Sequence, residues 1–178
     1  MSRSVLLVAV FLGAAALPVS AEPVTVQARF RVDRAALASL DAEIWRPMMT
    51  AYAAADLEGY LAVFAPDAVL ARGDLPTLSP LTESRAGEAR RFLLRRNHAG
   101  GFSREYRFTE RAAYRDWSSE RGIVAVTDPN GTIYEEFHYF CRKIEGRWRI
   151  TTAYRKRLPP GTAENFKLAA APGDWENF

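Results

Sequence analysis

Apolar residues recur at helical spacing early in the chain. They fall three or four positions apart and build one stripe: Leu37, Leu40, Ile44, Met48 and Tyr52. A stripe of this period predicts an amphipathic helix. Pro47 lies inside it, and because proline removes one backbone donor and clashes with the preceding turn, we expect a kink or a restart there.

The next segment predicts two helices and a strand, at 57–64, 85–97 and 68–72. Asp56 is placed to cap the first helix and Ser84 to cap the second. Pro66-Asp67 turns the chain from the first helix into the strand. The loop before the second helix contains two further prolines and predicts no regular structure.

Period-two alternation dominates from residue 105 onward and predicts a sheet. The expected strands span 105–117, 121–127, 132–144 and 147–157. Asn130-Gly131 is a strong tight-turn signal. If Glu145-Gly146 is a two-residue hairpin loop, Ile144 faces Arg147. Counting back along the hairpin then pairs Thr152 with Tyr139, Arg155 with Glu136 and Lys156 with Glu135.

The two ends of the chain lack this regularity. Residues 1–21 combine a basic start, a short apolar run and a V-S-A site, the pattern of a secretory signal peptide cleaved after Ala21. We therefore expect export, to a bacterial periplasm, with no membrane anchor after cleavage. Residues 22–34 form an arm or a strand. Residues 158–178 form a tail that is either disordered or packed on the domain or on a partner.

Composition excludes several classes of function. The formal net charge is +3, and it becomes +2 once the leader and its single charged residue, Arg3, are removed. So small an excess, spread along the chain, gives no footprint for nucleic acid. Cys141 is the single cysteine, so an internal disulfide is impossible. With two histidines besides, we expect no metal site and no cofactor.

Three segments together resemble the nuclear transport factor 2-like superfamily, in particular its SnoaL-like and ketosteroid-isomerase-like branches. They are the Asp56-capped helix, the FAPDAVL turn into a strand, and the closing hairpin KIEGRWRITTAY. The resemblance covers residues 35–157. It implies an α+β cone-shaped fold, in which a curved antiparallel sheet wraps around N-terminal helices and encloses a pocket. It also implies a homodimer formed through the sheet.

The resemblance bears on one position in particular. Ketosteroid-isomerase-like members carry an Asp general base on the strand after this turn, where the present chain has Arg72. An arginine cannot accept a proton near neutral pH. It suits an anionic ligand instead, through its bidentate fork.

Candidate site residues come from the inferred inner faces. Those expected to contact a small-molecule ligand are Trp45, Tyr52, Tyr60, Phe64, Arg72, Phe92, Tyr114 and Tyr154. Three acids share parity with buried aromatics and are candidates for general acid or base, with Tyr139 as a hydrogen-bond donor: Glu135, Asp116 and Glu110.

Three functions remain open at this level. The first is an exported domain that binds a small amphipathic or anionic molecule in its conical pocket. The second is an enzyme of the isomerase, dehydratase or cyclase type that uses an inward-facing acid. The third is a non-catalytic dimeric interaction domain whose cavity is filled by side chains.

Overall fold

The computed structural model describes residues 33–75, 78–96 and 101–174. The predicted signal peptide and most of the arm or strand after it lie outside these ranges. No helix within them is long and apolar enough to cross a membrane.

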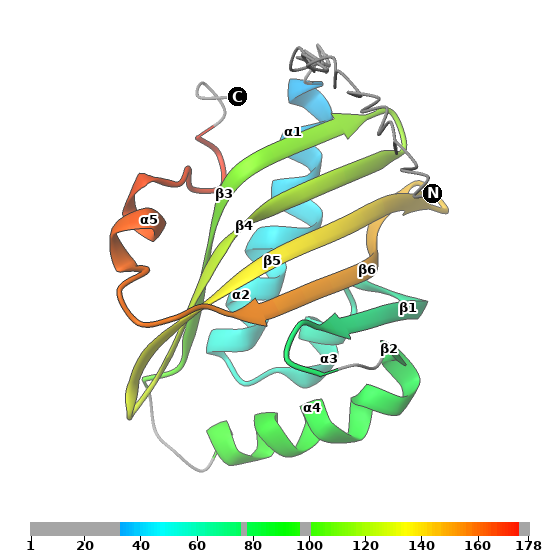
Figure 1. The fold of residues 1–178 in the computed structure, drawn as a ribbon. Helices are drawn as coiled ribbons and strands as arrows, with labels where there is room; N and C mark the ends of the chain where they lie inside the picture. The colour runs from blue at the N-terminus through cyan, green and yellow to red at the C-terminus, as the bar shows by residue number, and fades with distance from the viewer. Residues whose placement is uncertain (1–32, 76–77, 97–100, 175–178) are drawn as a thin grey trace, which may run out of the picture.

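The N-terminal helical stripe forms one rod that crosses a face of the sheet (Figure 1). It consists of α1 (Arg34–Leu40), the π-helical turn η1 (Asp41–Trp45) and α2 (Arg46–Ala53). Asp33 caps its start by accepting a hydrogen bond from the Ala36 N–H at 3.1 Å. Pro47 lies in the first turn of α2, directly after the π-helical turn. The helix therefore absorbs the missing proline donor by a local change of winding, which is the expected restart.

The segment after the rod contains α3 (Leu57–Leu61), β1 (Phe64–Arg72), β2 (Leu78–Pro80) and α4 (Leu81–Arg96). The prediction of the Asp56 cap is confirmed, because its carboxylate accepts from the Gly59 N–H at 3.0 Å. The Ser84 cap is wrong, because α4 begins three residues earlier and Ser84 lies inside it. The short β2 falls where the sequence predicted only loop.

The sheet has six strands in the order β2-β1-β6-β5-β4-β3. The four long strands are β3 (Ser103–Tyr114), β4 (Trp117–Asp128), β5 (Gly131–Ile144) and β6 (Arg147–Arg157). Neighbours pair antiparallel except β1 and β6, which run parallel. The sheet curves around the helical rod, with α4 beyond its β1–β2 end (Figure 1). The expectation of an α+β cone fold is thus confirmed.

Two β-bulges change which side chains face inward. One interrupts the β3–β4 ladder between Phe108 and Glu110, and the other interrupts β5–β6 between Phe140 and Cys141. The predicted pairing of Ile144 with Arg147 is confirmed. Beyond the second bulge, however, the predicted register is wrong by one residue, so that Phe137 faces Arg155. The reason is that a bulged strand contributes one extra residue and its later side chains change face.

Aromatic rings fill the core between the rod and the sheet. The ring of Trp45 has centroids of four other rings within 4.9–5.6 Å: Tyr106, Phe108, Phe137 and Tyr139. Cys141 is buried in the same cluster as a free thiol.

The C-terminal tail packs on the domain. It forms α5 (Ala163–Leu168), whose Phe166 packs against Ile123 and Tyr134 on the other face of the sheet. Ala170 then exchanges two backbone hydrogen bonds with Phe108, at 2.7 and 3.0 Å. The tail therefore packs on the domain as far as Asp174, which is one of the alternatives predicted for it.

Candidate functional site

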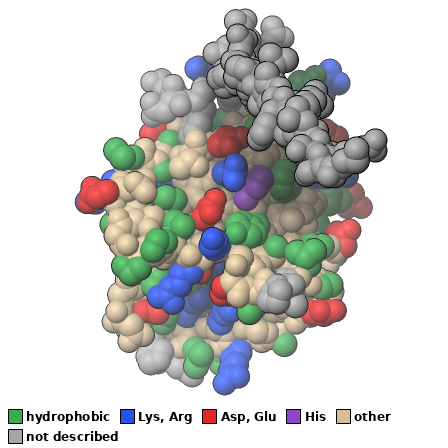
Figure 2. Space-filling view, in the orientation of Figure 1, with side chains coloured by type: hydrophobic (Ala, Val, Ile, Leu, Met, Phe, Trp, Pro, Cys, Tyr) green, Lys and Arg blue, Asp and Glu red, His purple; other side chains and the backbone are tan. Residues whose placement is uncertain are grey.

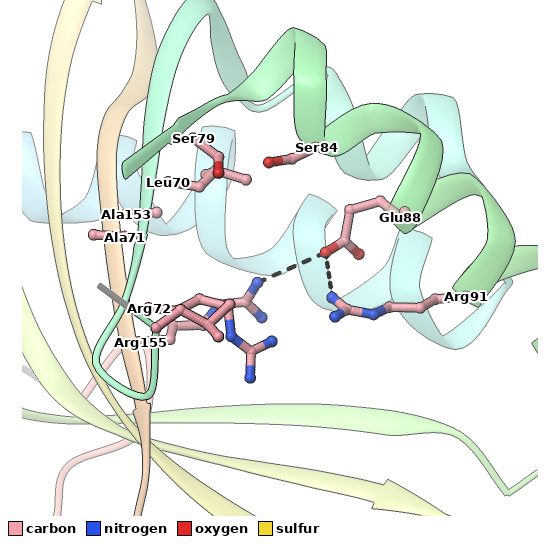
Figure 3. Close-up of a pocket in the computed structure, with 11 residues that line it drawn as sticks. Leu70, Ala71, Arg72, Ser79, Ser84, Glu88, Arg91, Ala153 and Arg155 are labelled. Carbon is pink, nitrogen blue, oxygen red and sulfur yellow. Dashed lines mark hydrogen bonds and ion pairs between the residues drawn. The ribbon is translucent and has the colours of Figure 1, made fainter. Parts of the chain in front are cut away.

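A cavity of about 200 Å³ lies between α4 and strands β1 and β6. We call it the arginine pocket, because three arginines from three elements line it: Arg72 from β1, Arg91 from α4 and Arg155 from β6. Figure 3 shows the side chains of Glu88 and Arg91 reaching from α4 toward Arg155. The site is therefore assembled by segments that are far apart in the sequence.

The α4 face that lines this pocket is polar. Ser84, Gly87, Glu88 and Arg91 all line it, and their spacing of three and four residues places them on one side of the helix. A helix that covers a sheet normally turns an apolar stripe inward. In α4 only Leu81 and Phe92 are buried apolar residues. The polar stripe reduces apolar packing, so it suggests a role in binding.

Gly87 is unusual at the middle of this helix. A glycine in the interior of a helix makes that helix less stable than an alanine would, by about 1 kcal/mol. A methyl group added at this position would meet no atom within 4 Å, so packing does not require glycine. Its effect is to leave the wall of the arginine pocket without a side chain.

Arg155 has the most unsatisfied hydrogen-bonding capacity in the site. Its side chain is only 13% exposed, and its two ion pairs are long, 3.9 Å to Glu88 and 3.8 Å to Glu135. A guanidinium carries five N–H donors. Within the described residues none of those on Arg155 makes a hydrogen bond. A buried cation with free donors is well suited to bind an anion.

Glu88 is the buried counterion of the arginine pocket. It is 4% exposed and accepts a hydrogen bond from Arg91 Nη1 at 2.7 Å. Burial by itself raises the pKa of Glu88, but Arg155, Arg104, Arg91 and Arg95 together hold that pKa below its ordinary value. Glu88 is thus ionised near neutral pH.

Two more arginines lie behind the pocket and stack on tyrosines. The guanidinium carbons of Arg95 and Arg104 lie 3.7 and 4.2 Å from the ring centroid of Tyr52. Arg104 donates to the Tyr60 hydroxyl at 2.6 Å, and Arg95 donates to the Tyr52 hydroxyl. Together with the pocket-lining arginines they give this region more positive than negative charge.

Buried polar atoms without hydrogen-bond partners gather in the same region. Among the described residues there are eight such side-chain atoms. Five belong to the arginine pocket or to groups that interact with it: Glu88 Oε2, Arg95 Nη1, Arg104 Nε, Glu135 Oε2 and the Tyr139 hydroxyl. Native structures contain few such atoms, so their concentration here makes this region the candidate site.

Several predicted ligand contacts lie close to this region. Arg72 lines the arginine pocket, but both arms of its fork already bind Asp74, at 3.0 and 2.8 Å. Tyr52 and Tyr60 lie behind the pocket against Arg95 and Arg104. Phe64 and Phe92 are buried in the adjacent core.

Other predicted ligand contacts lie elsewhere. Trp45 does not line the pocket, because it is completely buried and donates its indole N–H to Glu120 at 2.7 Å. Tyr114 is 45% exposed at the end of β3. Tyr154 is half-buried on the opposite face of β6 from Arg155. For Tyr114 and Tyr154 the inward placement is wrong, and the two bulges are the cause.

Of the four candidate catalytic residues, two lie near the arginine pocket and two do not. Glu135 pairs with Arg155, and burial raises the pKa of the nearby Tyr139 to about 12. Glu110 and Asp116, by contrast, are exposed. The inward placement of these two acids is wrong, since the bulge after Phe108 turns Glu110 outward and Asp116 lies in the turn beyond β3.

Sequence reasoning missed three residues that define the site. Glu88 lies seven residues after Leu81 and four before Phe92, so the helical period could have identified it as buried. Arg104 shares parity with Tyr106 and would have been found had the strand been extended by one residue. No sequence signal identified Arg155, because the bulge that turns its side chain inward contains neither glycine nor proline.

A second buried charge cluster lies at the π-helical turn of the rod. Arg111 bridges two buried carboxylates, Asp41 at 2.7 Å and Glu120 at 2.8 Å, with no more than 1% of any of the three side chains exposed. The Gly173 N–H donates to Asp41 at 2.7 Å. This cluster fastens the C-terminal tail to the helical rod. Within the described residues no group of three or more His, Cys, Asp or Glu could hold a metal ion.

Comparison with known proteins bears on the fold. No protein-family model and no curated protein matches this chain. A solved structure of an uncharacterised protein with a cystatin-like fold from Caulobacter vibrioides is similar, with a TM-score of 0.55 and 14% identity. The match covers 75% of this chain and 97% of that one.

Two further solved structures name the fold class. An NTF2-like protein of unknown function from Shewanella oneidensis has a TM-score of 0.51 and 16% identity, over 64% of this chain and 93% of that one. A ketosteroid isomerase-like protein from Erwinia carotovora atroseptica has a TM-score of 0.50 and 19% identity, over 70% and 97%. The chain thus has a nuclear transport factor 2-like fold. Identities this low define the fold alone.

Proposed function

We propose that this protein binds a small organic anion in the arginine pocket. The observation that carries the proposal is Arg155, a largely buried guanidinium with no hydrogen bond to any described residue and only long ion pairs. The excess of arginines over carboxylates around it favours an anion. The polar stripe of α4 and the missing side chain at Gly87 support a cavity kept open for a ligand.

The test is direct binding of short-chain carboxylates, from acetate to hexanoate, with inorganic phosphate and sulfate alongside, measured by isothermal titration calorimetry. At least one carboxylate is expected to bind, and Arg155→Met is expected to abolish binding. Arg157→Met, an exposed neighbour on the same strand, is the matched control. Circular dichroism verifies that both variants fold. Binding that is unchanged in Arg155→Met would contradict the proposal.

A steric variant tests the same pocket without changing charge. Gly87→Leu adds a side chain at the pocket wall, where nothing obstructs it, and is expected to weaken carboxylate binding at least tenfold. Ala86→Leu adds similar bulk at a neighbouring exposed position that does not line the pocket. Equal loss in both variants would mean that the pocket is not the binding site.

We also propose that the protein is exported and dimeric. The leader pattern of residues 1–21 supports export, and chain isolated from the periplasm is expected to begin at Glu22. Three hydrophobic side chains exposed on the sheet face away from the helical rod support dimerisation through the sheet: Trp117, Phe140 and Ile144. Figure 2 shows hydrophobic side chains mixed with charged ones on this face of the molecule.

A further inference from the structure

The arginine pocket has a second polar end. Ser79 from β2 and Ser84 from α4 line it, and both are half-buried. In Figure 3 the two serines lie together on one side of the pocket, while Arg72, Arg91 and Arg155 lie on the other. Neither serine hydroxyl makes a hydrogen bond with a described residue. Each is therefore available to donate to a ligand oxygen and to accept from it.

Between the two ends the pocket wall is apolar. Leu70 and Ala71 of β1 and Ala153 of β6 form this part of the lining. In Figure 3 they lie on the strand side, between the serines and the arginines. A ligand matched to this wall has an apolar chain between two polar groups.

The size of the cavity limits the length of that chain. A volume of about 200 Å³ is somewhat larger than the engineered cavity of about 150 Å³ that binds benzene, a molecule of six carbons. An acid of four to six carbons with one further oxygen has a comparable number of non-hydrogen atoms. Longer fatty acids exceed the cavity.

From these three observations we infer that the ligand is a short-chain carboxylic acid that carries an oxygen substituent at the far end from its carboxylate. The carboxylate binds at Arg155, beside Arg72 and Arg91. The distal hydroxyl or carbonyl oxygen binds Ser79 and Ser84, and the methylene groups lie along Leu70 and Ala153. This inference rests on the proposed anion site and adds the class of molecule that the site selects.

Paired ligands test the inference by calorimetry on the full mature chain. The pairs are butanoate with 4-hydroxybutanoate, pentanoate with 5-hydroxypentanoate, and hexanoate with 6-hydroxyhexanoate. In at least one pair the hydroxy acid is expected to bind about three- to tenfold more tightly, the ratio that corresponds to one added hydrogen bond. The diol 1,5-pentanediol, which lacks the anion, is expected not to bind.

A double variant assigns the difference to the serines. Ser79→Ala with Ser84→Ala is expected to bind the parent acid and its hydroxy acid with equal affinity. Ser103→Ala, at an exposed position at the start of β3, is the control and is expected to keep the preference.

The outcomes separate this inference from the proposed function. If every hydroxy acid binds wild type no better than its parent, the inference is overturned while the anion site stands. If the preference persists in the double variant, the serine assignment is overturned. If no acid binds at all, the proposed function itself fails.

Discussion

Glu88 and Arg155 illustrate how one residue constrains another in a buried site. Each would be costly to bury alone, because an isolated charge loses its hydration. Their separation of 3.9 Å offsets part of that cost without using the hydrogen-bond donors of Arg155. Glu88 instead accepts a short hydrogen bond from Arg91, whose side chain reaches solvent. The pair thus keeps a cation inside the protein and leaves its fork free for a ligand.

Glu88→Gln tests this balance through the pH dependence of stability. Because the folded-state pKa of Glu88 lies below its ordinary value, its stabilising contribution is present above the unfolded pKa of about 4.3. That contribution is lost as pH falls through the folded pKa. We expect Glu88→Gln to lower the free energy of unfolding by about 1–3 kcal/mol near neutral pH. The deficit is expected to shrink below about pH 4.

Urea unfolding monitored by circular dichroism from pH 3 to pH 7.5 measures this difference. Glu83→Gln, on the exposed side of the same helix, is the control and is expected to remain close to wild type throughout. A deficit in Glu88→Gln that stays constant across the pH range would show that the carboxylate charge is not what stabilises the fold.

At the scale of elements, helices and tight turns were predictable and the faces of strands were not. The Asp56 cap and the Glu145-Gly146 turn depend on local chemistry, and both are found as expected. The faces of β3 and β6 depend on bulges at Thr109 and Thr151. The first is accompanied by Gly122 of β4, which pairs with Phe108 and lies too close to the Arg107 backbone to carry a Cβ, but the second has neither glycine nor proline. Each bulge reverses the alternation of side chains along the strand that follows it. Glu110 therefore points outward, against the prediction, and Arg155 points inward.

Gly87 offers a prediction about α4 as an element. Gly87→Ala is expected to raise the free energy of unfolding by about 0.5–1 kcal/mol, because alanine has the higher helix propensity and the added methyl meets no atom. The reverse change one residue earlier, Ala86→Gly, is expected to lower it by a similar amount. Thermal and urea unfolding measure both. A destabilised Gly87→Ala would mean that the position is more crowded than its surroundings indicate.

At the scale of the whole molecule, the fold places different chemistry at two positions along the helical rod. The arginine pocket, with its excess of positive charge, lies beyond Tyr52 near the end of α2, where Arg95 and Arg104 stack on that ring. At the π-helical turn Arg111 lies between Asp41 and Glu120, and Asp41 also accepts a hydrogen bond from the Gly173 N–H. The resemblance of three short segments was enough to predict the cone. It could not predict this charge distribution, because the charged residues come from helices and strands that meet only in the folded chain.

The remaining question at this scale is whether two copies associate through the outer sheet face. Its exposed Phe140 and Trp117 come from adjacent strands, and desolvating them on association would stabilise a dimer. We expect light scattering after size exclusion to give twice the mass of the mature chain, and Phe140→Glu to shift the protein to monomer. Leu94→Glu changes an apolar residue on α4 that is even more exposed than Phe140 and is expected to leave the dimer intact. A monomeric wild type, or a Phe140→Glu variant as dimeric as wild type, would exclude this face as the interface.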